Sequence, residues 1–464
     1  MASGQRVRLG SEECGVLRRI WSNAAMTSQD ATLYGSTFAC PCGKTHTIRP
    51  ERIIYDRDAL TQLGPLARQH AKGDSASVVY DARTAAVAGV AAADALAGEG
   101  FRVKRVLLAD PKPGHSPVCD DLTFATLTQQ VGWADVIVPV GSGVISDFGK
   151  MLADERKVAS ICVATAGSMN GYASANVALT VGGLKTLLHS NAAAAVLARP
   201  DDIANAPYEM TVAGLGDVLA KPVSSADWRM NHLLFGDYYC QRSVDLIAQI
   251  EPKYLNDPLG ILARRPESIA ALFEALLLTG VAMTMAESSA PASGGEHMIS
   301  HTLDMKSHLL GRQHDLHGRQ VGVGTTLAAE IYRRVLAIDS PRWRLSDRGV
   351  DGGFWGPLAD AARQEYQAKV PRLGRAVESL SHGGTWDALR RELSPMLHGP
   401  EKIHNCLAQA RGATKAADLG CTKDLLLECL LHAHEFRSRF TILDLAILAG
   451  VLPGQAGEIV EQWA

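Results

Sequence analysis

Short apolar runs alternate with helix-period stretches between about Ser75 and Ala166. Strands are expected at 78–80, 106–108, 136–138 and 161–163, and helices at 84–97, at 122–131 and from about Ser146. Strands that recur with intervening helices pair in parallel, which predicts a Rossmann-like open α/β sheet. In such a sheet, ligands bind at the carboxyl ends of the strands.

After about Pro200 the strand signals fade, and helix-period stretches separated by Gly and Pro continue to the C-terminus. We therefore predict an N-terminal arm over residues 1–35, an α/β domain over 36–200 and an all-helical domain over 201–464. The longest apolar stretch, 275–286, is too short to span a bilayer and is bracketed by Glu274 and Glu287. We interpret it as a buried helix.

Composition and charge narrow the class of partner. The chain is 47% hydrophobic and 20% charged, as ordinary globular proteins are. Its net charge is −3 and its basic residues form no runs, which argues against nucleic acid and membrane surfaces and favours a small molecule. Nine scattered cysteines and the lack of an apolar signal core predict free thiols, no disulfides and a cytoplasmic location.

A glycine turn follows the strand expected at 136–138. Gly141 and Gly143 lead into a helix, where glycines let the backbone approach a phosphate and the helix N-terminus offers free N–H groups. This predicts a pyrophosphate site, although a plain tight turn is an equal alternative because the motif is not a full GxGxxG. Asp81, at the end of the first strand, is suited to ribose hydroxyls and would repel a 2′-phosphate, which favours NAD over NADP.

Histidines are concentrated in one segment. Five of the chain's 15 fall within 297–317: His297, His301, His308, His314 and His317. His297 and His301 are four apart, so on a helix they share a face. Neutral imidazole is the commonest metal ligand, and catalytic sites usually combine three protein ligands with an open position. We predict a metal site completed by a carboxylate, with surface positions for His308 and His314.

Asp217 is the candidate carboxylate. It follows Gly214-Leu-Gly inside an apolar helical stretch, where burying an acid is costly unless a partner such as a metal compensates. An N-cap at a helix start is the equal alternative.

Seven segments carry a resemblance to a known family. In chain order they resemble the signature segments of sn-glycerol-1-phosphate dehydrogenases, within the superfamily of iron-containing alcohol dehydrogenases, glycerol dehydrogenases and dehydroquinate synthases. The match extends from about residue 40 to 450. The segments are Cys-Pro-Cys-Gly-Lys-Thr-His (40–46), Gly-Ser-Gly-Val-Ile-Ser-Asp (141–147), Ala-Thr-Ala-Gly-Ser-Met-Asn-Gly-Tyr-Ala-Ser (164–174), Gly-Leu-Gly-Asp-Val-Leu-Ala-Lys (214–221), Ser-Gly-Gly-Glu-His-Met-Ile-Ser-His (293–301), Leu-His-Gly-Arg-Gln-Val-Gly (316–322) and Arg-Phe-Thr-Ile-Leu-Asp-Leu (439–445).

The resemblance implies a dehydroquinate synthase-like fold with a dinucleotide-binding α/β domain, a helical metal-binding domain and an active site between them. It implies that Asp217, His297 and His317 are the metal ligands and that His301 contacts the substrate and relays the proton. The implied cofactor contacts, together with the glycine turn, are Gly141, Gly143, Val144, Ile145, Ser146, Asp147, Thr165, Ala166, Gly167, Ser168 and Ser174.

The implied activity is metal-dependent interconversion of dihydroxyacetone phosphate and sn-glycerol 1-phosphate with NAD(H) or NADP(H), a step of phospholipid metabolism, by a homo-oligomer. Zn²⁺ suits the ligand set, and Ni²⁺ or Fe²⁺ would also fit. Asn170 stands where the family usually carries Asp in contact with substrate, so the exact substrate is open. Asp217, Lys221 and Lys185 are further substrate candidates, although either lysine is equally consistent with a solvated surface position.

Two alternatives remain from other classes. One is a carbocycle-forming lyase of the dehydroquinate synthase type, which uses NAD and a metal without net redox change. The other is a ligand-binding descendant without activity, against which the complete Asp217, His297 and His317 set argues.

Overall fold

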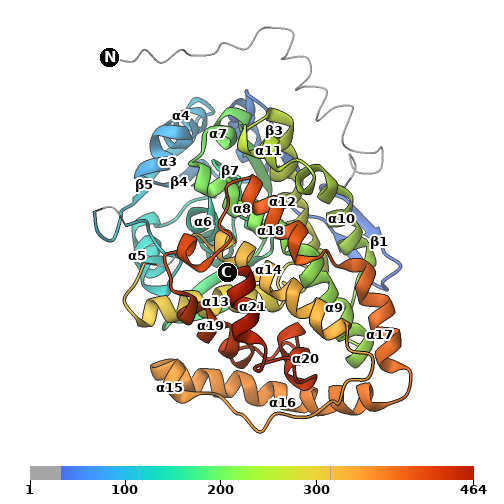
Figure 1. Ribbon diagram of the computed structural model, residues 1–464. Coiled ribbons are helices and arrows are strands. Elements are labelled where there is room, and N and C mark those ends of the chain that lie inside the picture. The colour runs from blue at the N-terminus through green and yellow to red at the C-terminus, as the bar shows by residue number, and fades with distance from the viewer. Residues whose placement is uncertain (1–32, 114, 314) are drawn as a thin grey trace.

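The structure is a computed structural model that describes residues 33–464 except 114 and 314. Most of the predicted N-terminal arm lies outside the described residues. Figure 1 shows the sheet and its helices in blue to green and the later helices in green to red. In this view, α15 and α16 form the lower edge of the molecule.

A six-stranded sheet forms the centre of the first half of the chain. Its order is β3-β10-β7-β6-β4-β5, and every neighbouring pair is parallel. All residues of β6 and β10 are buried, as expected for strands covered on both faces. The predicted parallel α/β sheet is confirmed. The strands are β3 (Arg52–Tyr55), β4 (Ser75–Asp81), β5 (Arg102–Leu108), β6 (Val136–Gly141), β7 (Ala159–Ala164) and β10 (Ala195–Ala198).

Helices connect these strands. The helix predicted over 84–97 consists of α3, a π-helical turn (Ala85–Gly89) and α4, and the helix predicted from Ser146 begins earlier, at Gly143. Gly89 is required for packing, because a β-carbon there would lie 2.8 Å from the Tyr80 ring. The helices are η3 (Ala59–Gln62), α2 (Leu63–His70), α3 (Ala82–Thr84), α4 (Val90–Gly98), α5 (Asp121–Val131), α6 (Gly143–Arg156) and η5 (Gly171–Ala173).

Two hairpins stand outside the main sheet, and the sequence analysis predicted neither. β1 (Thr37–Ala39) pairs with β2 (Thr45–Thr47), and β8 (Asn176–Val181) pairs with β9 (Leu184–His189), both antiparallel. Gly182 and Gly183 form the turn of the β8–β9 hairpin, with φ of +55° and +85°. A two-residue hairpin turn favours positive φ at both positions, which a Gly-Gly pair adopts readily.

The described chain after β10 is helical, as predicted, and the change falls next to the predicted boundary. The helices are α7 (Pro200–Asn205), α8 (Tyr208–Leu219), α9 (Lys221–Phe235), α10 (Gln241–Leu255), α11 (Pro258–Leu262), α12 (Pro266–Ala286), α13 (Gly295–Leu309), α14 (His317–Leu336), α15 (Gly352–Trp355), α16 (Ala359–Ser381), α17 (Thr385–Leu393), α18 (Pro400–Gln409), α19 (Lys423–His432), α20 (Ile442–Leu448) and α21 (Ala456–Trp463), with short 3-10 turns between some of them.

Within the described residues, α12 alone is long and apolar enough to cross a membrane. However, 89% of its most apolar 18-residue stretch is buried inside the protein, where α12 packs against α8 and α10. It is the buried helix expected from the apolar stretch 275–286.

Candidate active site

Glycines bring the predicted metal ligands together by letting α8 and α14 pack closely. A β-carbon at Gly216 would lie 2.1 Å from the carbonyl oxygen of Gly318, and one at Gly318 would lie 1.9 Å from that of Ala213. Only residues without a side chain permit this approach. Asp217, in the last turn of α8, therefore lies beside His317, the first residue of α14. The N-cap alternative for Asp217 is wrong, because an N-cap precedes the first turn.

Three imidazoles converge next to Asp217. His297 and His301 share a face of α13, as predicted, and their ring centroids are 5.9 Å apart. The His317 ring centroid lies 5.2 Å from that of His297 and 5.4 Å from that of His301. His308 is exposed on the same helix, as expected, and His314 lies outside the described residues.

Burial sets the charge state of this cluster. It lowers the pKa of His297 and His301 well below the usual value, reinforced by the positive groups around them, and it lowers the pKa of His317. Burial acts to raise the pKa of Asp217, but Lys221 and the nearby imidazoles outweigh it, so the net shift is downward. His297 Nε2 lies 3.7 Å from Asp217 Oδ1. The cluster thus offers one carboxylate and neutral imidazoles, the donors that a divalent transition metal prefers.

Glu296 orients His297, a role that the sequence analysis missed. Its Oε1 lies 2.8 Å from His297 Nδ1 and accepts a hydrogen bond from the Gly294 amide at 2.8 Å. A carboxylate that holds one ring nitrogen of a histidine leaves the other nitrogen free for a metal. The signal in the sequence was an acid directly beside a candidate ligand. Burial raises the pKa of Glu296 to about 7.

Lys221 is a partner of Asp217. Its Nζ lies 2.8 Å from Asp217 Oδ1 and donates to the carbonyl of Ala292 at 3.1 Å. The side chain is 1% exposed, so a solvated surface position is wrong for this residue. With its ammonium directed at Asp217, Lys221 is poorly placed for the predicted contact with a substrate phosphate. Lys185 is half-buried on β9, so it is no freely solvated lysine either, and neither lysine lines the cavity described below.

Asn170 is also tied to Asp217. Its backbone N–H donates to Oδ2 and its side-chain Nδ2 donates to Oδ1, both at 3.2 Å. The amide therefore contacts a predicted metal ligand directly and lines the cavity at the same time.

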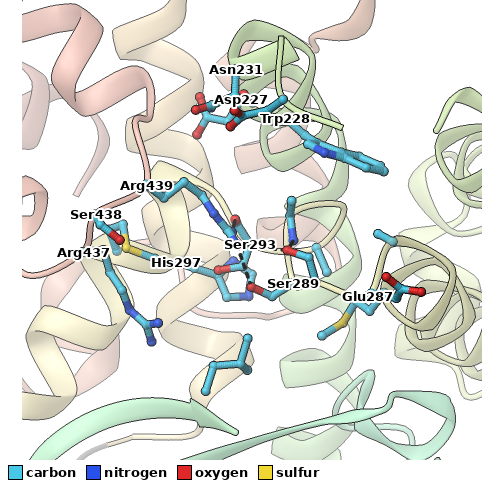
Figure 2. A pocket seen from close by; sticks show the side chains of 18 of the residues that line it. Asp227, Trp228, Asn231, Glu287, Ser289, Ser293, His297, Arg437, Ser438 and Arg439 are labelled. Carbon is cyan, nitrogen blue, oxygen red and sulfur yellow. Dashed lines mark hydrogen bonds between the residues drawn. The ribbon is translucent and has the colours of Figure 1, made fainter. Parts of the chain in front are cut away.

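A cavity of about 840 Å³ opens onto the cluster. It contains His297, His301, His317 and Asn170 together with residues that the sequence analysis did not assign: Lys44, Ser288, Ser289, Ser293, Arg437 and Arg439. Figure 2 shows the side chains of Arg437 and Arg439 on either side of His297, with Arg439 bonded to Ser289. Arg439 opens the signature segment 439–445 and Arg437 lies two residues before it, and this closeness to the segment was the available signal.

The two arginines give this part of the cavity positive charge. Arg439 donates to the Ser293 carbonyl at 2.5 Å and to Ser289 Oγ at 3.1 Å. Arg437 donates to the Lys185 carbonyl at 3.2 Å, and its buried Nε has no hydrogen-bond partner within the described residues. Burial lowers the pKa of Arg437, and it lowers the pKa of Arg439 to about 10, which leaves Arg439 charged at neutral pH.

The predicted cofactor residues lie at the carboxyl ends of three adjacent strands. Gly141 ends β6, Asp81 ends β4, and Thr165 follows β7 directly. Gly141 is required because a β-carbon would lie 2.7 Å from that of Ile145. Gly143 has φ of +37° and nothing within 4 Å of its missing β-carbon, so the start of α6 has an open side suited to a phosphate.

The remaining members of the predicted cofactor set divide into two groups. Some members are partly accessible, and among these the Ser168 hydroxyl lies 2.5 Å from that of Ser142 in the glycine turn. Ser174 is fully buried, and its Oγ accepts a hydrogen bond from the Asn176 amide, so it supports the local backbone. The accessible members are Gly143, Val144, Asp147 and Ser168, and the buried members are Gly141, Ile145, Ser146, Thr165, Ala166, Gly167 and Ser174.

Asp81 does not stand as an isolated negative charge. Its Oδ1 caps α3 by accepting from the amides of Arg83 and Thr84, and its Oδ2 pairs with the Arg83 guanidinium at 2.8 Å. Arg83 also pairs with Asp110 at 2.7 Å. The expected repulsion of a 2′-phosphate is therefore offset by a guanidinium at the same strand end.

Comparison with known proteins defines the class first. The family model for iron-containing alcohol dehydrogenases matches residues 54–207. The solved structure of glycerol dehydrogenase from Schizosaccharomyces pombe superimposes with a TM-score of 0.59 at 16% identity, covering 89% of this chain and 91% of that chain. The fold is therefore that of the iron-containing alcohol dehydrogenase class.

Curated sequences define the family. The chain is 30% identical over 421 residues to glycerol-1-phosphate dehydrogenase [NAD(P)+] of Bacillus licheniformis, covering 90% of this chain and 94% of the relative. The enzyme of the same name from Bacillus subtilis is 30% identical over 398 residues, covering 86% and 91%. The chain belongs to the glycerol-1-phosphate dehydrogenase family, which confirms the resemblance seen in the sequence.

Proposed function

We propose that this protein reduces dihydroxyacetone phosphate to sn-glycerol 1-phosphate with NADH or NADPH, in a reaction that depends on a divalent metal held by Asp217, His297 and His317. The observation that carries the proposal is the convergence of these three side chains at a cavity that His297 and His317 line together with Arg437 and Arg439. The names of these relatives support the substrate and the cofactor.

The donor set fits a metal. Two neutral imidazoles and one carboxylate leave a coordination position open, and Zn²⁺, Ni²⁺ and Fe²⁺ all accept such ligands, with Zn²⁺ our first choice. When bound, the ion would act as a Lewis acid on the substrate oxygen. The chain holds the ligands in place through Lys221 and Asn170 on Asp217 and through Glu296 on His297.

His301 is placed to move the proton. It lies in the cavity, and its buried Nδ1 has no hydrogen-bond partner in the described part of the chain. Because burial and neighbouring positive groups disfavour its charged form, a protonated His301 would give up its proton readily to the oxygen that gains negative charge during reduction. In the oxidative direction the neutral ring would accept it.

Arg437 and Arg439 are our candidates for the substrate phosphate, in place of Lys221 and Lys185. Guanidinium groups match phosphate oxygens with paired, charge-assisted hydrogen bonds. The unpartnered Nε of Arg437 offers one such donor, and Ser289 offers a hydroxyl beside Arg439. Binding at these groups would orient the carbonyl carbon toward the histidine cluster.

The carboxyl edge of the sheet suits a dinucleotide. The open turn at Gly143 would receive the pyrophosphate, and the paired Asp81 and Arg83 would meet the adenosine ribose. A carboxylate and a guanidinium at one place favour acceptance of both NADH and NADPH.

A lyase of the dehydroquinate synthase type is the second candidate, because Asn170 departs from the family's usual Asp at a position that lines the cavity. Net oxidation of NADH distinguishes the two. Metal-loaded protein should oxidise NADH stoichiometrically with dihydroxyacetone phosphate and form sn-glycerol 1-phosphate. Turnover of a cyclic-product precursor without net change in NADH would support the lyase, and ligand binding without turnover would support an inactive descendant. The cytoplasmic location and homo-oligomeric assembly remain predictions.

A further inference from the structure

A second cluster of potential metal ligands lies away from the histidines of α13. Cys40 and Cys42 lie in the turn between β1 and β2, and His46 lies within β2. Cys240 is the N-cap residue of α10, far along the chain. Figure 1 shows β1, in blue, beside α10.

The four side chains form a compact group. Their ligand atoms all lie within 4.8 Å of one another. The Cys40 and Cys240 sulfurs are 3.8 Å apart, and His46 Nε2 lies 3.2 Å from Cys42 Sγ and 3.7 Å from Cys240 Sγ. A tetrahedral zinc site with Zn–S bonds of about 2.3 Å would separate two sulfurs by about 3.8 Å and a sulfur from a nitrogen by about 3.5 Å. The three separations given above are close to these values.

We propose that Cys40, Cys42, His46 and Cys240 bind a structural Zn²⁺ ion that is distinct from the ion at Asp217. Three thiolates and one imidazole form a soft, four-ligand set that suits Zn²⁺ and leaves no coordination position open for substrate. The site contributes to structure and takes no part in hydride transfer.

The hairpin of β1 and β2 is small enough to need an ion for its stability. Two strands of three residues each form too small a sheet to be stable alone. His46 is 4% exposed, and its Nε2 lies among thiols. The Tyr238 hydroxyl lies 3.2 Å from Cys42 Sγ, where it can donate to a thiolate ligand. An ion at the centre would fasten the N-terminal hairpin to the start of α10.

An ion at the cysteine cluster would also position one wall of the cavity. Lys44, between the cysteines and His46, pairs with Glu287 at 2.7 Å and lies over the Tyr238 ring at 4.3 Å. All three of these residues line the cavity. Loss of the ion would therefore release a cationic group from the cavity edge.

A disulfide is the main alternative for these thiols. At 3.8 Å, the Cys40 and Cys240 sulfurs are much farther apart than the roughly 2.05 Å of a disulfide bond, and Cys40, Cys42 and Cys240 are all free. Oxidation of any two of these cysteines to a disulfide would leave one thiol and His46 as the remaining ligands, too few for the four-ligand site.

Metal analysis of the purified protein tests the proposal. Wild type should carry one Zn²⁺ at the cysteine cluster in addition to any metal at the histidine cluster. Cys240→Ser and Cys42→Ser should each lose one equivalent, whereas Cys421→Ser, a partly buried cysteine outside the cluster, should keep the wild-type content. Equal metal content in Cys240→Ser and wild type would overturn the proposal, as would a Cys40–Cys240 disulfide found by mass spectrometry of unreduced protein.

Cobalt substitution gives a readout that does not depend on the folding of a cysteine variant. Co²⁺-loaded His297→Ala protein, with the histidine cluster disabled, should show the near-ultraviolet charge-transfer absorption of thiolate ligands. Cys42→His offers an imidazole in place of a thiolate, so it should keep the metal with a weaker band. Absence of the thiolate band in His297→Ala would contradict the assignment, whatever the outcome for the histidine cluster.

Discussion

The ammonium of Lys221 lies 2.8 Å from the carboxylate of Asp217, and the two side chains are 1% and 2% exposed. This pair places a positive charge beside a proposed metal ligand. It keeps Asp217 ionised and oriented before an ion arrives, because burial alone would favour the protonated acid.

Lys221→Met should destabilise the metal-free protein, because it leaves Asp217 buried without a cation. Breaking a buried pair in this way costs about 3–5 kcal/mol. A divalent ion would replace the missing charge, so metal should restore more stability to the variant than it adds to wild type. Urea unfolding with and without metal measures both effects.

Lys369→Met is the matched control. Lys369 pairs with Asp444 at 2.9 Å, and both side chains are 1% exposed. This variant should lose comparable stability and recover none of it with metal. Equal recovery in the two variants would show that the rescue of Lys221→Met is unspecific.

Asn170→Asp should alter both substrate preference and metal binding. An amide in place of the family's Asp removes a charge-assisted hydrogen bond to substrate, so wild type should be about five- to thirty-fold less efficient with dihydroxyacetone phosphate than the variant. Since Asn170 donates to Asp217, a second carboxylate there should tighten metal binding. Steady-state kinetics measures the change in substrate preference, and metal titration measures the change in metal affinity. A variant that is less efficient than wild type with dihydroxyacetone phosphate would mean that the Asn170 amide belongs to a working glycerol-1-phosphate site.

Arg83→Ser should reduce the efficiency with NADPH by about ten-fold or more, the loss expected when a charged hydrogen-bond donor of roughly 1.5–3 kcal/mol is removed. Efficiency with NADH should change little. The reason is that Arg83 supplies the cation at the end of β4, where Asp81 alone would repel a 2′-phosphate. Kinetics with both cofactors check this, and an equal loss for the two would show that Arg83 does not contact the 2′-phosphate.

The stability of the metal-free protein should be greatest at about pH 6.5–7. Burial raises the pKa of Asp227 to about 8 and that of Glu296 to about 7, so as pH falls through these values the folded state binds protons that the unfolded state does not, and stability rises. Below about 6.5 the unfolded state protonates buried histidines that stay neutral when folded, and stability falls. These histidines are His297, His301, His317 and His434.

Unfolding free energies measured across pH 5–9 test this profile. Asp227→Asn should flatten its alkaline side, because the amide does not titrate. Stability that keeps rising below about pH 6 would contradict the assignment of neutral buried histidines.

Much of the α/β fold could be predicted because four of its strands each contain a short continuous apolar run. β4, β5, β6 and β7 all coincide with predicted segments. β3 and β10 are four residues long, and the β8–β9 hairpin begins at a polar residue, Asn176, so their patterns were too short or too mixed. β3 and β10 also depend on pairing with strands distant in the sequence, which local periodicity does not report.

The site was predictable where its members are close in sequence or form a motif. The spacing of His297 and His301 predicts a shared helix face, which α13 has. The sequence could not show that Lys221 and Asn170 both bond Asp217, or that Cys240 joins Cys40 and Cys42, because each relationship depends on packing between separate elements.

The most direct test of the account compares metal content and turnover in three histidine variants, with His308→Ala as the exposed control on α13. His297→Ala and His317→Ala should fold, lose the metal of the histidine cluster and lose NADH oxidation with dihydroxyacetone phosphate. His301→Ala should keep that metal and lose most of its turnover, and His308→Ala should resemble wild type. Full occupancy of the histidine-cluster metal together with wild-type turnover in either His297→Ala or His317→Ala would contradict the central claim.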